Sequence, residues 1–101
     1  MIRREGNRMV IAGPATLATV AALLQEGREQ IEAGVSTVDL GEVSELDSSA
    51  LAMLLAWLRE ARARGRELAF VGLPEGLVAI ARLYGVADLL PLAQGSPARH
   101  H

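Results

Sequence analysis

The sequence predicts a single α/β domain with a small, mostly parallel (mixed) β-sheet of about four strands, covered by three to four helices. Apolar segments typical of strands alternate with segments whose apolar residues recur every three or four positions. The connections are short, so each helix returns the chain to the same edge of the sheet. The chain has 101 residues, and half of them are apolar, which suits one hydrophobic core.

The first expected strand is an apolar run at residues 8–13 that ends at Gly-Pro, and an earlier strand could include Ile2. A helix is expected after Thr16, which can cap it. Gly34 is a natural end for this helix, because glycine tolerates the left-handed conformation. Its apolar stripe, at three- and four-residue steps, comprises Leu17, Val20, Ala21, Leu24 and Ile31.

The second strand is expected at residues 36–41, followed by a loop at residues 42–47 and a helix that begins near Ser48. Leucines at helical spacing predict the core-facing stripe of this helix, formed by Leu51, Leu54, Leu55 and Leu58. An arginine-rich segment follows, and the helix is expected to end around Gly65.

A third strand is expected at residues 67–72, and Pro74 suits the first turn of a third helix, where its missing amide hydrogen costs nothing. The core stripe of that helix would comprise Leu77, Ile80, Ala81 and Tyr84. Residues 86–93 are apolar and fit either a final strand or a helical turn. We therefore expect one domain at residues 1–94 and a frayed tail at residues 95–101.

Composition and motifs exclude several classes of function. The formal net charge of −2 gives no electrostatic footprint for nucleic acid or an anionic membrane. Cysteine is absent, and no apolar segment approaches the roughly 20 residues that span a bilayer, so we expect a cytoplasmic protein without membrane insertion. Phosphate-cradling loops, nucleophile elbows and metal-binding helix motifs do not occur. These observations favour a binding module without a cofactor over an enzyme.

One segment carries a family resemblance. Residues 38–55 read Val-Asp-Leu-Gly-Glu-Val-Ser-Glu-Leu-Asp-Ser-Ser-Ala-Leu-Ala-Met-Leu-Leu. An apolar-Asp-Leu strand, an apolar-Asp-Ser step, small residues and a leucine-rich helix follow one another here, and this order resembles the signature of the STAS family. The likeness extends over roughly residues 9–92. It implies a STAS fold and a non-catalytic role in binding other proteins.

Within this family the sequence is most similar to the MlaB-type branch, through Leu-Ala-X-Leu-Leu at residues 51–55 and Ala-Arg-Leu-Tyr-Gly-Val-Ala-Asp-Leu-Leu-Pro at residues 81–91. The resemblance implies a cytoplasmic accessory subunit that binds and supports the ATPase of a phospholipid-transport ABC transporter at the inner membrane. The related anti-sigma-factor antagonists imply an alternative, a regulator whose partner is an anti-sigma-factor kinase. Ala50 stands where the family often has glycine.

Two interpretations of Ser48 are open. A serine at a helix start can cap the helix, which is worth about 0.5–2 kcal/mol against alanine. A helix start also tolerates a phosphate, which would add about −1.5 to −2 charge beside Asp47. In anti-sigma-factor antagonists the matching serine is the phosphoacceptor, whereas in the MlaB-type branch the matching residue lies in the surface that meets the ATPase. The resemblance therefore implies a functional role for Ser48.

The expected partner-binding surface surrounds this position and comprises Glu45, Asp47, Ser48, Ser49, Ala50, Met53 and Trp57. Met53 and Trp57 are core residues if another element covers their face of the helix. Otherwise they form an exposed docking pair, since tryptophan is enriched in interface hot spots. Asp39 and Asp47 could suggest paired catalytic carboxylates, but no basic or nucleophilic companion accompanies them, so strand-end and capping roles are favoured.

Overall fold

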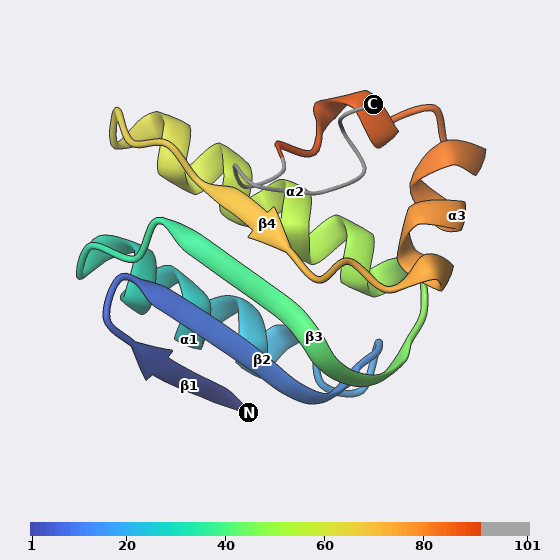
Figure 1. Ribbon diagram of the computed structural model, residues 1–101, viewed down its shortest axis with the longest axis horizontal. Helices are drawn as coiled ribbons and strands as arrows, with labels where there is room; N and C mark the ends of the chain where they lie inside the picture. Colours follow the sequence, from blue (N-terminus) through green and yellow to red (C-terminus); the bar gives the residue numbers. More distant parts are fainter. Residues whose placement is uncertain (92–101) are drawn as a thin grey trace.

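A four-stranded mixed sheet in the order β1-β2-β3-β4 forms the centre of the fold (Figure 1). The computed structural model describes residues 1–91. The elements follow along the chain as β1 Ile2–Glu5, β2 Arg8–Ala15, α1 Val20–Glu32, β3 Thr37–Leu46, α2 Ser48–Ala63, β4 Ala69–Val71, α3 Glu75–Leu83 and the 3₁₀ turn η1 Ala87–Leu89. The predicted α/β architecture is confirmed, while the expected boundary at residue 94 and the tail at 95–101 lie outside the described residues.

The sheet combines one antiparallel hairpin with two parallel pairings. β1 pairs antiparallel with β2 through a turn at Gly6, whose φ of 66° is the left-handed conformation that glycine adopts most easily. β2 pairs with β3, and β3 with β4, in parallel, and helices α1 and α2 supply the crossovers. The early strand that could include Ile2 is thus present, and it makes the sheet mixed.

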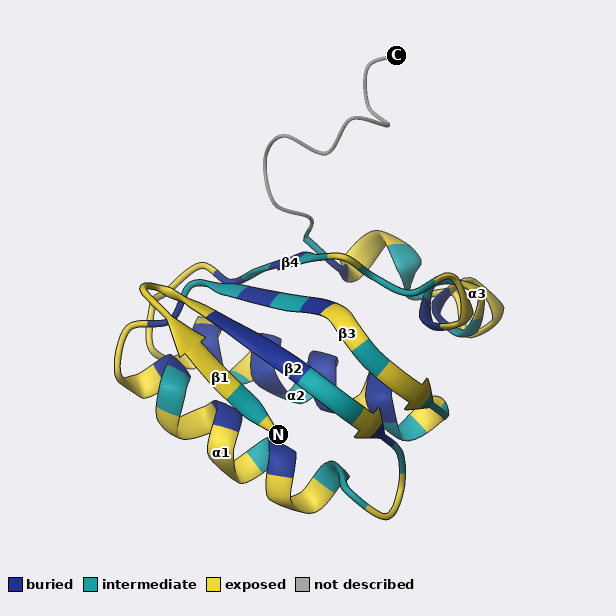
Figure 2. Cartoon of the chain, turned by 60° about the horizontal axis from the view of Figure 1, so that its bottom comes forward, coloured by how far each residue is buried: buried dark blue, intermediate teal, exposed yellow. Residues whose placement is uncertain are grey.

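Helices α1 and α2 pack beside each other on one face of the sheet (Figure 2). Alternate residues of the strands point toward these helices, as Met9 and Ile11 of β2 do, and they are buried. The largest fully buried side chains include Trp57, Phe70, Met9, Ile11, Ile31, Leu40, Met53, Leu54 and Leu77. The core therefore lies between the sheet and the helices, and α3 follows the carboxyl end of β4 at the side of this layer (Figure 1).

Helix α1 begins later than the sequence predicts. Thr19, not Thr16, is the residue that precedes the helix. The Thr19 hydroxyl accepts a hydrogen bond from Thr16 N at 3.0 Å and donates one to Pro14 O at 2.9 Å, which folds this segment into a turn. Leu17 is consequently 77% exposed, and Ala21 is exposed as well, although both were expected in the core stripe.

Strand β3 is longer than predicted, because it continues through the segment expected to be a loop and ends at Leu46. β2 pairs with this extension as far as Ala15, with register shifts after Val10 and Gly13. Such irregularities disrupt the pairing locally and bend the strand, and here the pairing resumes after each shift. Glu42 accordingly lies on the sheet, where Arg3 of β1 forms an ion pair with it at 2.9 Å.

The described chain ends beside β4. After η1, the backbone of Leu90 is extended, and Pro91 O accepts a hydrogen bond from Phe70 N at 2.8 Å. Of the two interpretations of this segment, the helical turn is confirmed at η1, and the described residues contain no strand after β4. Residues 92 and 93 lie outside the described residues.

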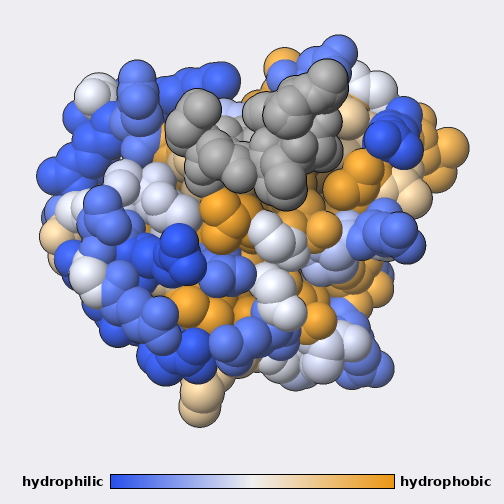
Figure 3. Space-filling model, in the orientation of Figure 1, coloured by the Kyte–Doolittle hydropathy of each residue, from blue (hydrophilic) through white to orange (hydrophobic). Residues whose placement is uncertain are grey.

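The end of α3 carries exposed apolar side chains. Leu83 and Tyr84 at this end are exposed, as is Leu89 of the following turn η1, and Figure 3 shows apolar surface gathered over the side of the molecule that α3 occupies. The prediction that Tyr84 belongs to the core stripe is wrong, because this residue lies at the C-terminus of the helix, where it is solvent-exposed.

Candidate partner-docking site

The carboxyl ends of β2 and β3 meet the start of α2 at a surface that we call the Asp47 corner, comprising residues 14–19 and 44–49. Asp47 is the N-cap of α2: one carboxylate oxygen accepts a hydrogen bond from Ser49 N at 2.8 Å, and the other accepts one from Leu17 N at 3.0 Å. These two hydrogen bonds hold the pKa of the Asp47 carboxyl below its usual range, because both favour the charged form. The bond from Leu17 has the larger effect and the bond from Ser49 the smaller. Asp47 thereby joins the start of α2 to the turn before α1.

Ser48 is the first residue of α2 and is exposed at this corner. The helix cap is Asp47, one residue earlier, so the interpretation of Ser48 as the cap is wrong. The helix therefore does not depend on the Ser48 hydroxyl to begin. The backbone amides of the first turn and the helix dipole make this position favourable for an anionic group.

The other residues expected around Ser48 differ in exposure. Ser49 is half-buried, and Ala50 is only 2% exposed, so Ala50 supports the corner from inside. Glu45, near the end of β3, is exposed, as is Leu17 on the neighbouring turn. The corner thus presents a hydroxyl, an acidic side chain and an apolar side chain to solvent.

Met53 and Trp57 do not belong to this surface, and their assignment to a docking surface is corrected. Their exposed fractions are 0% and 1%, because helix α1 covers their side of α2. The indole lies against Gly27, where a Cβ atom would be only 2.2 Å from Trp57 Cζ2. Trp57 Nε1 donates a hydrogen bond to Leu24 O at 3.2 Å. Of the two interpretations left open by the sequence, the core interpretation is the right one.

Sequence reasoning missed the roles of two residues, Leu17 at the Asp47 corner and Gly27 in the core. Leu17 is exposed because the turn at Thr19 delays α1; the second threonine after Pro14 was a signal for this later start. Gly27 makes room for Trp57. A glycine inside a helix costs roughly 1 kcal/mol relative to alanine, so its presence in a helical pattern was a signal for a close approach by another element.

Asp39 and Asp47 both accept hydrogen bonds from backbone amides, in line with the strand-end and capping roles that the sequence favoured. Asp39 Oδ1 accepts a hydrogen bond from Gly41 N at 2.8 Å, and Oδ2 lies 3.5 Å from Arg8 Nη1. Residues 1–91 contain no group of three His, Cys, Asp or Glu residues placed to hold a metal ion. In the same part of the chain, no helix combines the length and apolar character required to cross a bilayer.

The mixed four-stranded sheet, the two helices on one face and the Asp-Ser step at the start of α2 together define a STAS domain. The family model described as MlaB, STAS domain, matches residues 1–91. The chain belongs to this MlaB-type STAS family, as its sequence resemblance implied.

Among curated proteins, the chain is 35% identical over 69 residues to the intermembrane phospholipid transport system binding protein MlaB of Escherichia coli strain K12, covering 67% of this chain and 71% of that protein. Among solved structures, SpoIIAA in its unphosphorylated form, an anti-sigma factor antagonist, matches with a TM-score of 0.69 and 15% identity over 97% of this chain and 90% of that chain. The Bacillus SpoIIAA has also been solved in its phosphorylated form. A putative anti-sigma factor antagonist from Thermotoga maritima matches with a TM-score of 0.73 and 13% identity, over 97% of this chain and 89% of that chain. At these low identities, the structural matches show that the chain shares the fold of these proteins.

Proposed function

We propose that this chain is a cytoplasmic, non-catalytic accessory subunit that binds and supports the ATPase of a phospholipid-transport ABC transporter, and that it reaches the inner membrane through this complex. The observation that carries the proposal is its 35% identity with a binding protein of an intermembrane phospholipid transport system. The exposure of Ser48 and Glu45 beside the Asp47 cap supports docking at this corner.

The Asp47 corner is suited to docking because its backbone is already ordered. The two bonds to Asp47 connect Leu17 N and Ser49 N, so the turn before α1 and the start of α2 keep one arrangement. A partner that binds an ordered surface pays less conformational entropy than one that must order a loop. In this proposal Ser48 and Glu45 contact the ATPase, whereas Asp47, Ser49 and Ala50 support the surface.

A tagged pull-down from native cell lysate, with wild type compared to Ser48→Glu and Ser48→Ala, tests this proposal. Mass spectrometry should identify an ABC ATPase with wild type and with Ser48→Ala. Recovery should fall for Ser48→Glu, because glutamate adds bulk and negative charge to the surface. Equal recovery by Ser48→Glu would contradict docking through Ser48, and the absence of any ABC ATPase from the wild-type sample would contradict the function itself.

A second candidate function is an anti-sigma-factor antagonist controlled by phosphorylation of Ser48. It is favoured by the exposed hydroxyl at the start of α2 and by the likeness to SpoIIAA, a protein solved in both forms. Incubation with an anti-sigma-factor kinase and ATP, followed by mass spectrometry, would then show a phosphate on Ser48. An unmodified Ser48, under conditions that phosphorylate a control antagonist, would eliminate this candidate.

A further inference from the structure

The exposed side of α2 forms a continuous ridge that begins at Ser48. Its members follow one another at alternating spacings of four and three residues, which places them along one side of the helix. We call this set the α2 ridge; it comprises Ser48, Ala52, Leu55, Arg59 and Arg62. All of them are exposed except Leu55, which is half-buried. The proposed docking corner and the far end of α2 therefore share one surface.

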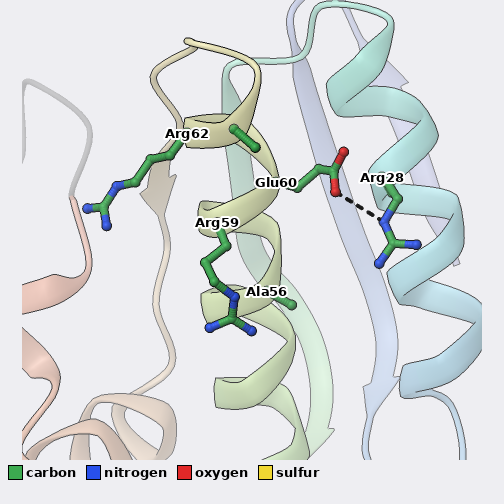
Figure 4. A pocket seen from close by; sticks show the side chains of 6 residues that line it. Arg28, Ala56, Arg59, Glu60 and Arg62 are labelled. Carbon is green, nitrogen blue, oxygen red and sulfur yellow. Dashed lines mark ion pairs between the residues drawn. The ribbon is translucent and has the colours of Figure 1, made fainter.

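The positive charges at the far end of the ridge are not balanced by the neighbouring carboxylate. Glu60 forms ion pairs with Arg64 at 2.9 Å and with Arg28 of α1 at 3.5 Å. Among residues 1–91, Arg59 and Arg62 take part in no ion pair. Figure 4 shows Glu60 directed toward α1, while Arg59 and Arg62 point away from that pair. Two exposed guanidinium groups thus form no ion pair within the described chain.

A shallow depression adjoins these arginines (Figure 4). It is lined by Arg28, Ala56, Arg59, Glu60, Arg62 and Ala63. The two alanines allow another chain to approach the helix closely, and the three arginines outnumber the single glutamate. The depression therefore offers a small apolar floor with a cationic rim, which is complementary to a segment that carries carboxylates.

We propose that the α2 ridge docks an acidic segment of the same ATPase that contacts Ser48, with carboxylates of that segment placed against Arg59 and Arg62. This inference rests on the proposed function. Continuity and charge support this proposal. Arg59 and Arg62 lie about 16 Å and 21 Å along the helix from Ser48, at roughly 1.5 Å per residue. One partner helix can span that distance, and guanidinium groups bind carboxylates with two parallel hydrogen bonds.

The test is the affinity of the purified ATPase subunit of the phospholipid transporter for the full-length chain, measured at low and physiological salt. The double variant Arg59→Glu/Arg62→Glu should bind about tenfold more weakly at low salt, with a flatter salt dependence. Arg59→Lys/Arg62→Lys should keep most of the affinity, because it keeps the charge. Arg82→Glu is the matched control: it reverses an exposed arginine of α3 that also forms no ion pair within the described residues, and it should bind like wild type.

The outcomes separate the two proposals. If Ser48→Glu weakens binding while the double arginine variant binds as tightly as wild type, the ridge proposal is overturned and the proposed function stands. If wild type does not bind the ATPase, both fall. Sedimentation of the chain alone gives a third arm: if the arginine variant changes self-association without changing ATPase affinity, the ridge is a contact between copies, and the proposal is overturned.

Discussion

The inner and outer faces of α2 differ in what covers them. On the inner face, Trp57 lies against Gly27 of α1 and is buried. On the outer face, Ser48 and Arg59 remain exposed, although they belong to the same helix. The difference teaches that α1 buries Trp57, which the sequence alone left open, because Gly27 has no side chain to occupy the place of the indole. The outer face is the one that we propose for partner docking.

The largest effect on stability is expected from removing the buried Trp57 side chain on the inner face of α2. Trp57→Ala should lower the free energy of unfolding by about 3–5 kcal/mol, because it removes a buried aromatic side chain and leaves a cavity. Urea unfolding followed by circular dichroism measures this difference. Unchanged stability together with lost partner binding would show that Trp57 contacts the partner and would contradict the distinction between the two faces.

Gly27→Ala should destabilise the fold by about 1–3 kcal/mol, because the new Cβ would meet the indole at 2.2 Å. Gly76→Ala in α3 is the matched control: its Cβ would lie 3.7 Å from Leu46 Cδ1, an ordinary contact. That control should be neutral or slightly stabilising, because alanine favours helices. Differential scanning calorimetry of both variants compares them, and equal melting temperatures would contradict the packing of Trp57 on Gly27.

A smaller effect is expected from the Asp47 carboxylate, and it depends on pH. Its pKa is lower in the folded chain than the usual value of about 3.9, so it adds stability that is present above that value and is lost as the pH falls through the folded pKa. Urea unfolding should therefore show wild type to be more stable than Asp47→Asn at pH 7, with the difference narrowing below about pH 4.

Asp47→Ala is the companion to this experiment. Asp47→Ala should be less stable than Asp47→Asn both at pH 7 and below about pH 4, because asparagine can still accept the capping hydrogen bond and alanine cannot. A difference between wild type and Asp47→Asn that stays constant down to pH 3 would show that the charge of Asp47 does not contribute.

The smallest effect on stability is expected on the outer face. Ser48→Ala should change the free energy of unfolding by no more than about 0.5 kcal/mol, because Asp47 caps the helix and Ser48 is exposed. Chemical denaturation can measure this limit. A loss above 1 kcal/mol would assign Ser48 a structural role and weaken the contrast between the faces.

The order of strands and helices could be predicted because it depends on near neighbours. Hydrophobic periodicity located α2 and α3, and the Asp-Ser step located the corner. Two of the errors arose where distant segments meet, and a third arose at a local turn. The extension of β3 needs its pairing with β2, the exposure of Leu17 needs the turn at Thr19, and the burial of Trp57 needs Gly27 on another helix. The pairing of β3 and the packing of Trp57 are not visible in one segment taken alone, whereas the turn at Thr19 is local and its second threonine was a signal that the prediction overlooked.

The most direct test of the central claim is a calorimetric titration of the purified transporter ATPase with wild type and with Ser48→Glu, each first shown to be folded by its unfolding free energy. The account predicts tight binding of wild type and a loss of affinity of about tenfold or more for Ser48→Glu, with stability nearly unchanged. Equal affinity of the two proteins would contradict docking at the Asp47 corner.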